Sequence, residues 1–195
     1  DAMGKWHYES ISVCPPNNVA CTHEQCAGPQ IAQAIARLKA GQGDQLKALS
    51  VLVHLIGDIH EPLHAAENGD NGANSVRVAN RTCMTNDGTW EQCKLHKYWD
   101  NNLVKAALGK RSEKDFVNEL SKINVDTTGD AESWLRESNG IAMSAVHSYD
   151  GFACKVGANT IKLTEAYDQA AAAVVTQQLA KAGHRLAAIL NVVYE

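Results

Sequence analysis

Three histidines and an aspartate stand close together in HLIGDIHEPLH, residues 54–64, within an otherwise apolar stretch of the chain. On a helix of about 3.6 residues per turn, His54 and Asp58 share one face, whereas His60 points to the opposite side. A proline two residues before His64 must end or bend the helix, so this imidazole can turn back toward the same cavity. Imidazole and carboxylate groups placed together in this way can bind zinc or another borderline divalent metal.

A second pair with the same spacing, His96 and Asp100, occurs in LHKYWD. Taken alone, either pair is explained as well by chance, or by a hydrogen-bonded histidine in the core. A buried carboxylate, however, carries a heavy desolvation penalty that a bound metal ion would offset. Two such pairs together with His64 therefore favour a metal site.

The elements that must position these residues are mostly helical. Apolar residues at helical spacing, with capping signals at their ends, predict helices at 29–41, 44–60, about 95–108, 112–122, 130–148 and about 160–192. From residue 65 to 87 the chain is rich in Gly, Asn and Asp around the short alternation SVRVA, which predicts a long polar loop with a small hairpin. With no repeat or linker, we expect an all-α architecture, a single helical domain over residues 1–195.

Composition limits the classes of function. The chain has 195 residues, 45% of them hydrophobic, and no apolar run near the roughly 20 residues of a membrane span, so we expect no membrane partner. A net charge of -4 provides no broad basic surface for a phosphate backbone, so any phosphate binding must be local.

Cysteine usage indicates an oxidising compartment. The six cysteines are an even number without a C-x-x-C pair, which predicts disulfides and a secreted or periplasmic protein. One N-x-S/T sequon, at Asn80, fits export, but whether it is glycosylated stays open. The chain begins at Asp1 without an initiator Met or a signal segment, so we expect a processed or incomplete N-terminus.

Several of these motifs together resemble a known family. LVHLIGDIHEPLH, GDNGAN and LHKYWD, with KWHY upstream and AKAGHRLAAILN near the end, resemble the zinc-dependent single-strand-specific nuclease and 3′-nucleotidase family, of the nuclease S1 and P1 type. The likeness runs from about Trp6 to the C-terminus. Because that family is similar in fold to zinc phospholipase C, the resemblance implies an all-helical domain whose cleft holds three zinc ions.

The resemblance also assigns metal ligands. The matching positions are His7, His54, Asp58, His64, His96 and Asp100. The first three would bind one zinc ion, with the catalytic Asp58 bridging to a second, and the last three would bind the third. His60 receives no role, in agreement with its place on the other helical face.

Two further residues match positions that bind substrate in the family. Tyr8, directly after the first histidine ligand, would stack on a nucleobase, and Asn74 would lie near the base pocket. A packed tyrosine and a turn asparagine explain the same residues without a ligand. Ser10 stands where many relatives place Asp or Asn, which leaves base preference open.

The activity implied by the resemblance is zinc-dependent endonucleolytic hydrolysis of single-stranded DNA and RNA to 5′-phosphates, with 3′-nucleotidase activity, by a monomer. Adjacent zinc ions would activate a shared water, and a stacking aromatic requires an unpaired base. Two alternatives remain open. A zinc phospholipase C would use the same metals on a lipid head group, and an exported, disulfide-rich protein could bind metal without turnover.

The chain departs from the family pattern near its start. Family members begin with a tryptophan whose amino group and carbonyl bind the second zinc, followed by a histidine and a further metal-binding aspartate. None of the three is present before His7, so we expect that an N-terminal segment is missing. The site of His64, His96 and Asp100 should then be the best occupied of the three.

The resemblance also implies disulfide pairings. Two pairs follow the family pattern and a third is inferred from the cysteines left over: Cys21–Cys26, Cys14–Cys154 and Cys83–Cys93.

Overall fold

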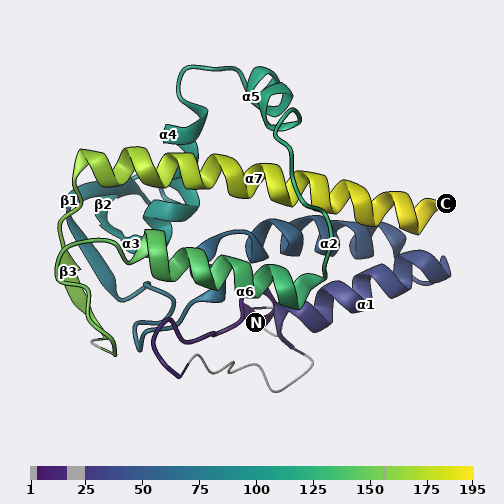
Figure 1. Cartoon of the computed structure of the whole chain (residues 1–195), viewed down its shortest axis with the longest axis horizontal. Helices are drawn as coiled ribbons and strands as arrows, with labels where there is room; N and C mark the ends of the chain where they lie inside the picture. The colour runs from purple at the N-terminus through teal and green to yellow at the C-terminus, as the bar shows by residue number, and fades with distance from the viewer. Residues whose placement is uncertain (1–3, 17–24, 156) are drawn as a thin grey trace.

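The computed structural model describes residues 4–16, 25–155 and 157–195, and most of these residues are helical. The long helix α7 (Glu165–Tyr194) runs along most of the length of the molecule, with a small sheet near its first turns and the C-terminus at the other end (Figure 1). This arrangement confirms the predicted mostly helical class.

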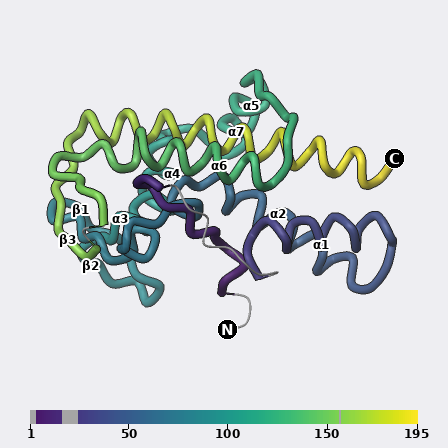
Figure 2. The backbone as a smooth tube through the Cα atoms, turned by 60° about the horizontal axis from the view of Figure 1, so that its bottom comes forward, coloured from purple at the N-terminus to yellow at the C-terminus, as the bar shows by residue number. Residues whose placement is uncertain are grey.

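Two antiparallel helices, α1 (Ala27–Ala40) and α2 (Gln45–Ile59), lie side by side at the end away from the sheet (Figures 1 and 2). α1 ends at Gly41, whose φ of 60° places it in the left-handed region that favours glycine at a helix C-terminus. α2 begins after Asp44, whose side chain accepts a hydrogen bond from the amide of Lys47. The end of α1 and the start of α2 therefore follow from the sequence signals.

A hairpin is present, but its second strand lies beyond the predicted range of 65–87, and it is part of a larger sheet. β1 (Val76–Met84) pairs antiparallel with β2 (Trp90–Lys94), and β3 (Asn159–Ile161) pairs parallel with β1 on its other edge. The start of the last helix was predicted wrongly, because residues 159–161 extend the sheet. Thr164 accepts a hydrogen bond from the amide of Tyr167 and thereby sets the true start of α7.

The remaining helices match the predicted segments, with two irregular turns. A π-helical stretch interrupts the segment from residue 95 to 108, and another ends the segment from 131 to 146. The bounds are α3 (Leu95–Lys97), η3 (Tyr98–Leu103), α4 (Val104–Leu108), α5 (Glu113–Leu120), α6 (Ala131–Ile141) and η4 (Ala142–Val146). Short 3-10 turns occur at η1 (Gly4–His7) and η2 (Pro62–Ala65).

Buried apolar side chains form two clusters. One packs the sheet against η3, α4 and the first half of α7, and includes Val78, Trp99 and Leu103. The other packs α1 and α2 against α6, and includes Leu52 and Leu135. The α2 end and η2, which carry the HLIGDIHEPLH motif, contribute to both, with Ile59 in the second and Leu63 in the first. The motif is thus fixed by packing from two sides.

Two of the predicted disulfides are confirmed, Cys14–Cys154 and Cys83–Cys93. The third prediction lies outside the described residues, because Cys21 is not among them. Disulfides are typical of oxidising compartments. Within the described ranges, no helix combines the length and the apolar character needed to cross a membrane.

Candidate metal centre

The six predicted ligands gather into two clusters, each with donor atoms within 4.8 Å of one another. The three-residue cluster consists of His7 from η1 with His54 and Asp58 from α2. The four-residue cluster contains three predicted ligands and one residue that sequence reasoning missed: Glu61, His64, His96 and Asp100.

The three-residue cluster is centred on one carboxylate oxygen. Asp58 Oδ2 lies 2.8 Å from His7 Nδ1 and 3.2 Å from His54 Nε2. The His54 side chain is 59% exposed and that of His7 is 38% exposed. A zinc ion held by three protein ligands with an open fourth position is the usual arrangement of a catalytic site.

His7 reaches α2 because the chain after it runs beside the HLIGDIHEPLH turn. The amide of Glu9 donates to the carbonyl of His64 at 2.8 Å, and the amide of Glu67 donates to the carbonyl of Ile11 at 2.9 Å. These backbone contacts join segments more than fifty residues apart, so they carry no signal at the level of sequence spacing.

The four-residue cluster offers enough donors for a complete coordination shell. Asp100 Oδ1 lies 3.4 Å from His64 Nε2, and Asp100 Oδ2 lies 3.4 Å from His96 Nε2. Glu61 Oε2 lies 3.9 Å from His64 Nε2. Four imidazole and carboxylate ligands suit tetrahedral zinc.

Backbone carbonyls orient both imidazoles of this cluster. His64 Nδ1 donates to the carbonyl of His7 at 2.6 Å, and His96 Nδ1 donates to the carbonyl of Gly72 at 2.7 Å. A carbonyl can only accept, so the proton lies on Nδ1 and Nε2 faces the carboxylates with a lone pair when the ring is neutral. Gly72 has a φ of +57°, and an added Cβ there would lie 3.2 Å from the carbonyl of Leu63.

The charges of this cluster fit a bound cation. Burial raises the pKa of Glu61, and its Oε1 has no hydrogen-bond partner in the described part of the chain. Burial lowers the pKa of His64, but the hydrogen bond to Asp100 and the charge of Glu61 outweigh it, so the net shift is upward. In the metal-free protein, protons held by Glu61 and His64 thus reduce the negative charge of this buried cluster. A divalent ion would do so more completely and would pair the unsatisfied oxygen.

Glu61 carried a sequence signal that was not used. It lies between His60 and Pro62, three residues before His64, and its side chain accepts a hydrogen bond from the amide of His64 at 3.0 Å. An acidic residue at the start of a short turn beside two histidines is a candidate ligand as well as a cap.

A recess of about 290 Å³ opens beside both clusters. It is lined by the ligands His7, His64 and His96 together with the two predicted substrate-binding residues, Tyr8 and Asn74. Tyr8 is exposed, and Asn74 Nδ2 donates to the carbonyl of Asn71 at 3.1 Å. The structure therefore brings all eight predicted site residues to one region.

His60 lies outside both clusters, on the opposite side of the helix end as the spacing predicted. Its ring is buried against Trp134, with centroids 5.8 Å apart, and its Nδ1 donates to the carbonyl of Ile56 at 2.7 Å.

Comparison with known proteins places this geometry in a family. A model of the S1/P1 nuclease family matches residues 1–195. Endonuclease 1 of Arabidopsis thaliana is 31% identical over 76% of this chain and 50% of its own length. Nuclease S1 of Aspergillus oryzae is 31% identical over 77% of this chain and 55% of its own length. Nuclease P1 of Penicillium citrinum is 25% identical over 99% of this chain and 79% of its own length.

This chain spans about half the length of the first two of these relatives. The family match nevertheless covers every residue, including both HxxxD pairs and the turn between them. The chain therefore belongs to the S1/P1 nuclease family.

Proposed function

We propose that this chain carries the zinc centre of an endonuclease that hydrolyses single-stranded DNA and RNA to 5′-phosphates and also removes the 3′-phosphate of nucleotides. The main support is one observation: the proposed ligands His7, His64 and His96 line the same recess as Tyr8. A base held in that recess would place its phosphate beside both clusters.

The metal ligands would divide as the two clusters do. Zinc ions would be held by the three-residue cluster and by the four-residue cluster, and a further ion, implied by the resemblance, would share Asp58. When bound, such ions supply Lewis-acid activation of a water and charge compensation for phosphate oxygens. The chain's own part is to hold Asp58 between His7 and His54 and to keep the exposed side of this cluster open to substrate.

Tyr8 would select single strands. The residue is 43% exposed, so its ring would be accessible to an unpaired base. Base stacking on an aromatic side chain contributes about 1–3 kcal/mol per base and needs no particular sequence. Asn74 lines the same recess and would offer a hydrogen bond to the base edge.

The disulfides and the net charge bear on where the protein acts and how it would bind a polyanion. Two disulfides within the described ranges support export, to the outside of the cell or to a periplasm. With a net charge of -4, binding of a polyanion would depend on bound zinc rather than on a basic surface. We propose that it acts as a monomer.

The test compares substrates and metal states. A single-stranded oligonucleotide, its duplex and a choline phospholipid are incubated with zinc-loaded protein, and products are identified by mass spectrometry. We expect cleavage of the single strand to 5′-phosphates, its loss on chelation and its recovery when zinc is restored. Hydrolysis that survives exhaustive chelation would refute the proposal. Hydrolysis of the phospholipid alone would favour the phospholipase C alternative. Hydrolysis of none of the three substrates would favour a metal-binding protein without turnover.

A further inference from the structure

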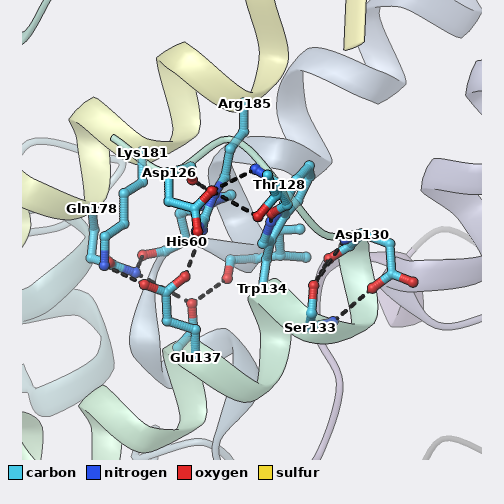
Figure 3. Close-up of polar contacts among 12 residues, drawn as sticks. His60, Asp126, Thr128, Asp130, Ser133, Trp134, Glu137, Gln178, Lys181 and Arg185 are labelled. Carbon is cyan, nitrogen blue, oxygen red and sulfur yellow. Dashed lines mark hydrogen bonds and ion pairs between the residues drawn. The ribbon is translucent and has the colours of Figure 1, made fainter. Parts of the chain in front are cut away.

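The end of α2 is held by side chains from two other helices. The last carbonyl groups of a helix have no partner within the helix. Here, Ser138 Oγ of α6 donates to the carbonyl of Ile59 at 2.6 Å. Gln178 Nε2 of α7 donates to the carbonyl of His60 at 2.9 Å, and both of these residues are labelled in Figure 3. Gln178 Nε2 also lies 3.3 Å from Ser138 Oγ, which links the two contacts.

The ring of His60 is fixed in the same place. Arg185 Nη1 donates to His60 Nε2 at 3.0 Å and forms an ion pair with Glu137 Oε2 at 2.7 Å (Figure 3). An arginine can only donate, so His60 Nε2 accepts and the ring is neutral, with its proton on Nδ1 toward Ile56. The histidine to which the resemblance gave no role thus ties α2 to α7.

The far end of the same turn is held as well. Asn139 Nδ2 of α6 donates to the carbonyl of Ala65 at 2.8 Å and to that of Ile11 at 3.1 Å. Glu61 directly follows His60, and His64 directly precedes Ala65. Both turn-borne ligands of the four-residue cluster therefore lie between two points that are fixed by buried hydrogen bonds.

Burying these polar side chains costs more free energy than packing apolar side chains in the same places. Ser138, Asn139, Gln178 and Arg185 are all buried, with at most 5% of each residue exposed. Within the part of the chain that the structure describes, Gln178 Oε1 has no hydrogen-bond partner. An apolar side chain would fill the same space without desolvating an unpaired oxygen.

We propose that Ser138, Asn139, Gln178 and Arg185 form a turn brace, a set of positioning residues that holds Glu61 and His64 in the geometry required for metal binding. The inference rests on the proposed metal centre. Residues that orient metal ligands without touching the metal commonly change metal affinity by about 10- to 100-fold when they are substituted. The brace would act in this way on the backbone that carries the ligands.

The test is Gln178→Leu, which keeps similar volume and removes the donor to His60. It is made in a His54→Ala background, so that Co²⁺ titration reports the four-residue cluster. We expect Co²⁺ affinity to fall by about 10-fold or more, and the visible absorption of bound Co²⁺ to change in position or intensity. Thr176→Val on the same helix is the matched control, because among the described residues its hydroxyl bonds only to the carbonyl of Ala172 in its own helix.

Circular dichroism shows whether each variant folds. Ser138→Ala removes a smaller contact to the same turn, and we expect it to lower Co²⁺ affinity several-fold. This variant provides the test if Gln178→Leu does not fold. Unchanged affinity and spectrum in a folded Gln178→Leu protein would overturn the brace alone. Failure of the His54→Ala parent to bind Co²⁺ would overturn the metal centre itself, and the brace with it.

Discussion

The two clusters of candidate metal ligands differ in how their imidazoles are held. In the four-residue cluster, the side chains of His64 and His96 are 13% and 16% exposed, and each donates through Nδ1 to a backbone carbonyl. In the three-residue cluster, the side chains of His7 and His54 are 38% and 59% exposed, and both rings contact the carboxylate of Asp58.

This difference indicates two roles. A pre-oriented set of four ligands favours tight binding, because little ordering remains to be done when the metal arrives. A set of three ligands with an exposed side leaves a position for water and substrate. We infer that the four-residue cluster mainly holds charge in place and that the three-residue cluster lies closest to the reaction.

The largest expected effect is on turnover and comes from Asp58→Asn, which removes the charge shared by His7 and His54. A metal ion supplies several kcal/mol of transition-state stabilisation, so we expect a loss of about 10³-fold or more in kcat on single-stranded DNA. Asp44→Asn is the control at the other end of α2, because asparagine is an equally good helix cap. Equal activity of the two variants would remove Asp58 from the catalytic centre.

Zinc affinity should also differ between the two clusters, by a smaller factor than the change in kcat expected for Asp58→Asn. Competition titration of His54→Ala, which retains the four-residue cluster, should report zinc binding about 10- to 100-fold tighter than titration of His96→Ala, which retains only the three-residue cluster intact. The reverse order would show that burial and backbone hydrogen bonds do not decide affinity here.

Tyr8 tests whether one substrate spans both clusters, because it follows His7 in sequence and lines the recess with His64 and His96. Tyr8→Ala should raise KM for a single-stranded oligonucleotide by about 10-fold, in keeping with the loss of about 1–3 kcal/mol of stacking. Tyr8→Phe keeps the ring and should leave KM nearly unchanged. A large effect of the phenylalanine variant would point to the hydroxyl instead of the ring.

The smallest effect concerns pH. In the metal-free chain the pKa of His64 is raised from 6.5 to about 10, because contact with Asp100 and Glu61 outweighs the effect of burial. Its stabilising contribution is therefore complete below about pH 6.5 and is lost as the pH rises toward about 10. Each kcal/mol lost should lower Tm by about 2–4 °C.

Zinc replaces that proton, so the gain in Tm on adding zinc should grow over the same pH range. Thermal unfolding of chelated and zinc-loaded protein measures both trends. A metal-free chain that becomes more stable as the pH rises through this range would contradict the assigned charges.

The sequence predicted those parts of the site that are set by local geometry. The HxxxD spacing of His54 with Asp58 and of His96 with Asp100 needs only a helical turn, and both pairs are in contact. His7 was identified only through the family resemblance, because its contact with Asp58 spans fifty-one residues. Glu61 was missed although it stands three residues before His64, because its position before a proline at the start of a 3-10 turn is also explained by a capping role.

The same division holds for the fold. Helix ends with capping residues, such as Asp44 and Ser112, lie where the sequence indicated. Strand β3 was read as part of a helix because three residues are too few to show alternation, and its pairing with β1 depends on residues more than eighty positions away. Non-local contacts of this kind are decided by packing and not by local pattern.

The most direct test of the two-cluster account is anomalous diffraction at the zinc absorption edge from crystals of zinc-loaded protein. The account predicts one anomalous peak among Glu61, His64, His96 and Asp100, present even at limiting zinc. A second peak among His7, His54 and Asp58 should grow as the zinc concentration is raised. Peaks only at other positions, or a peak at the three-residue cluster while the four-residue cluster stays empty, would contradict it.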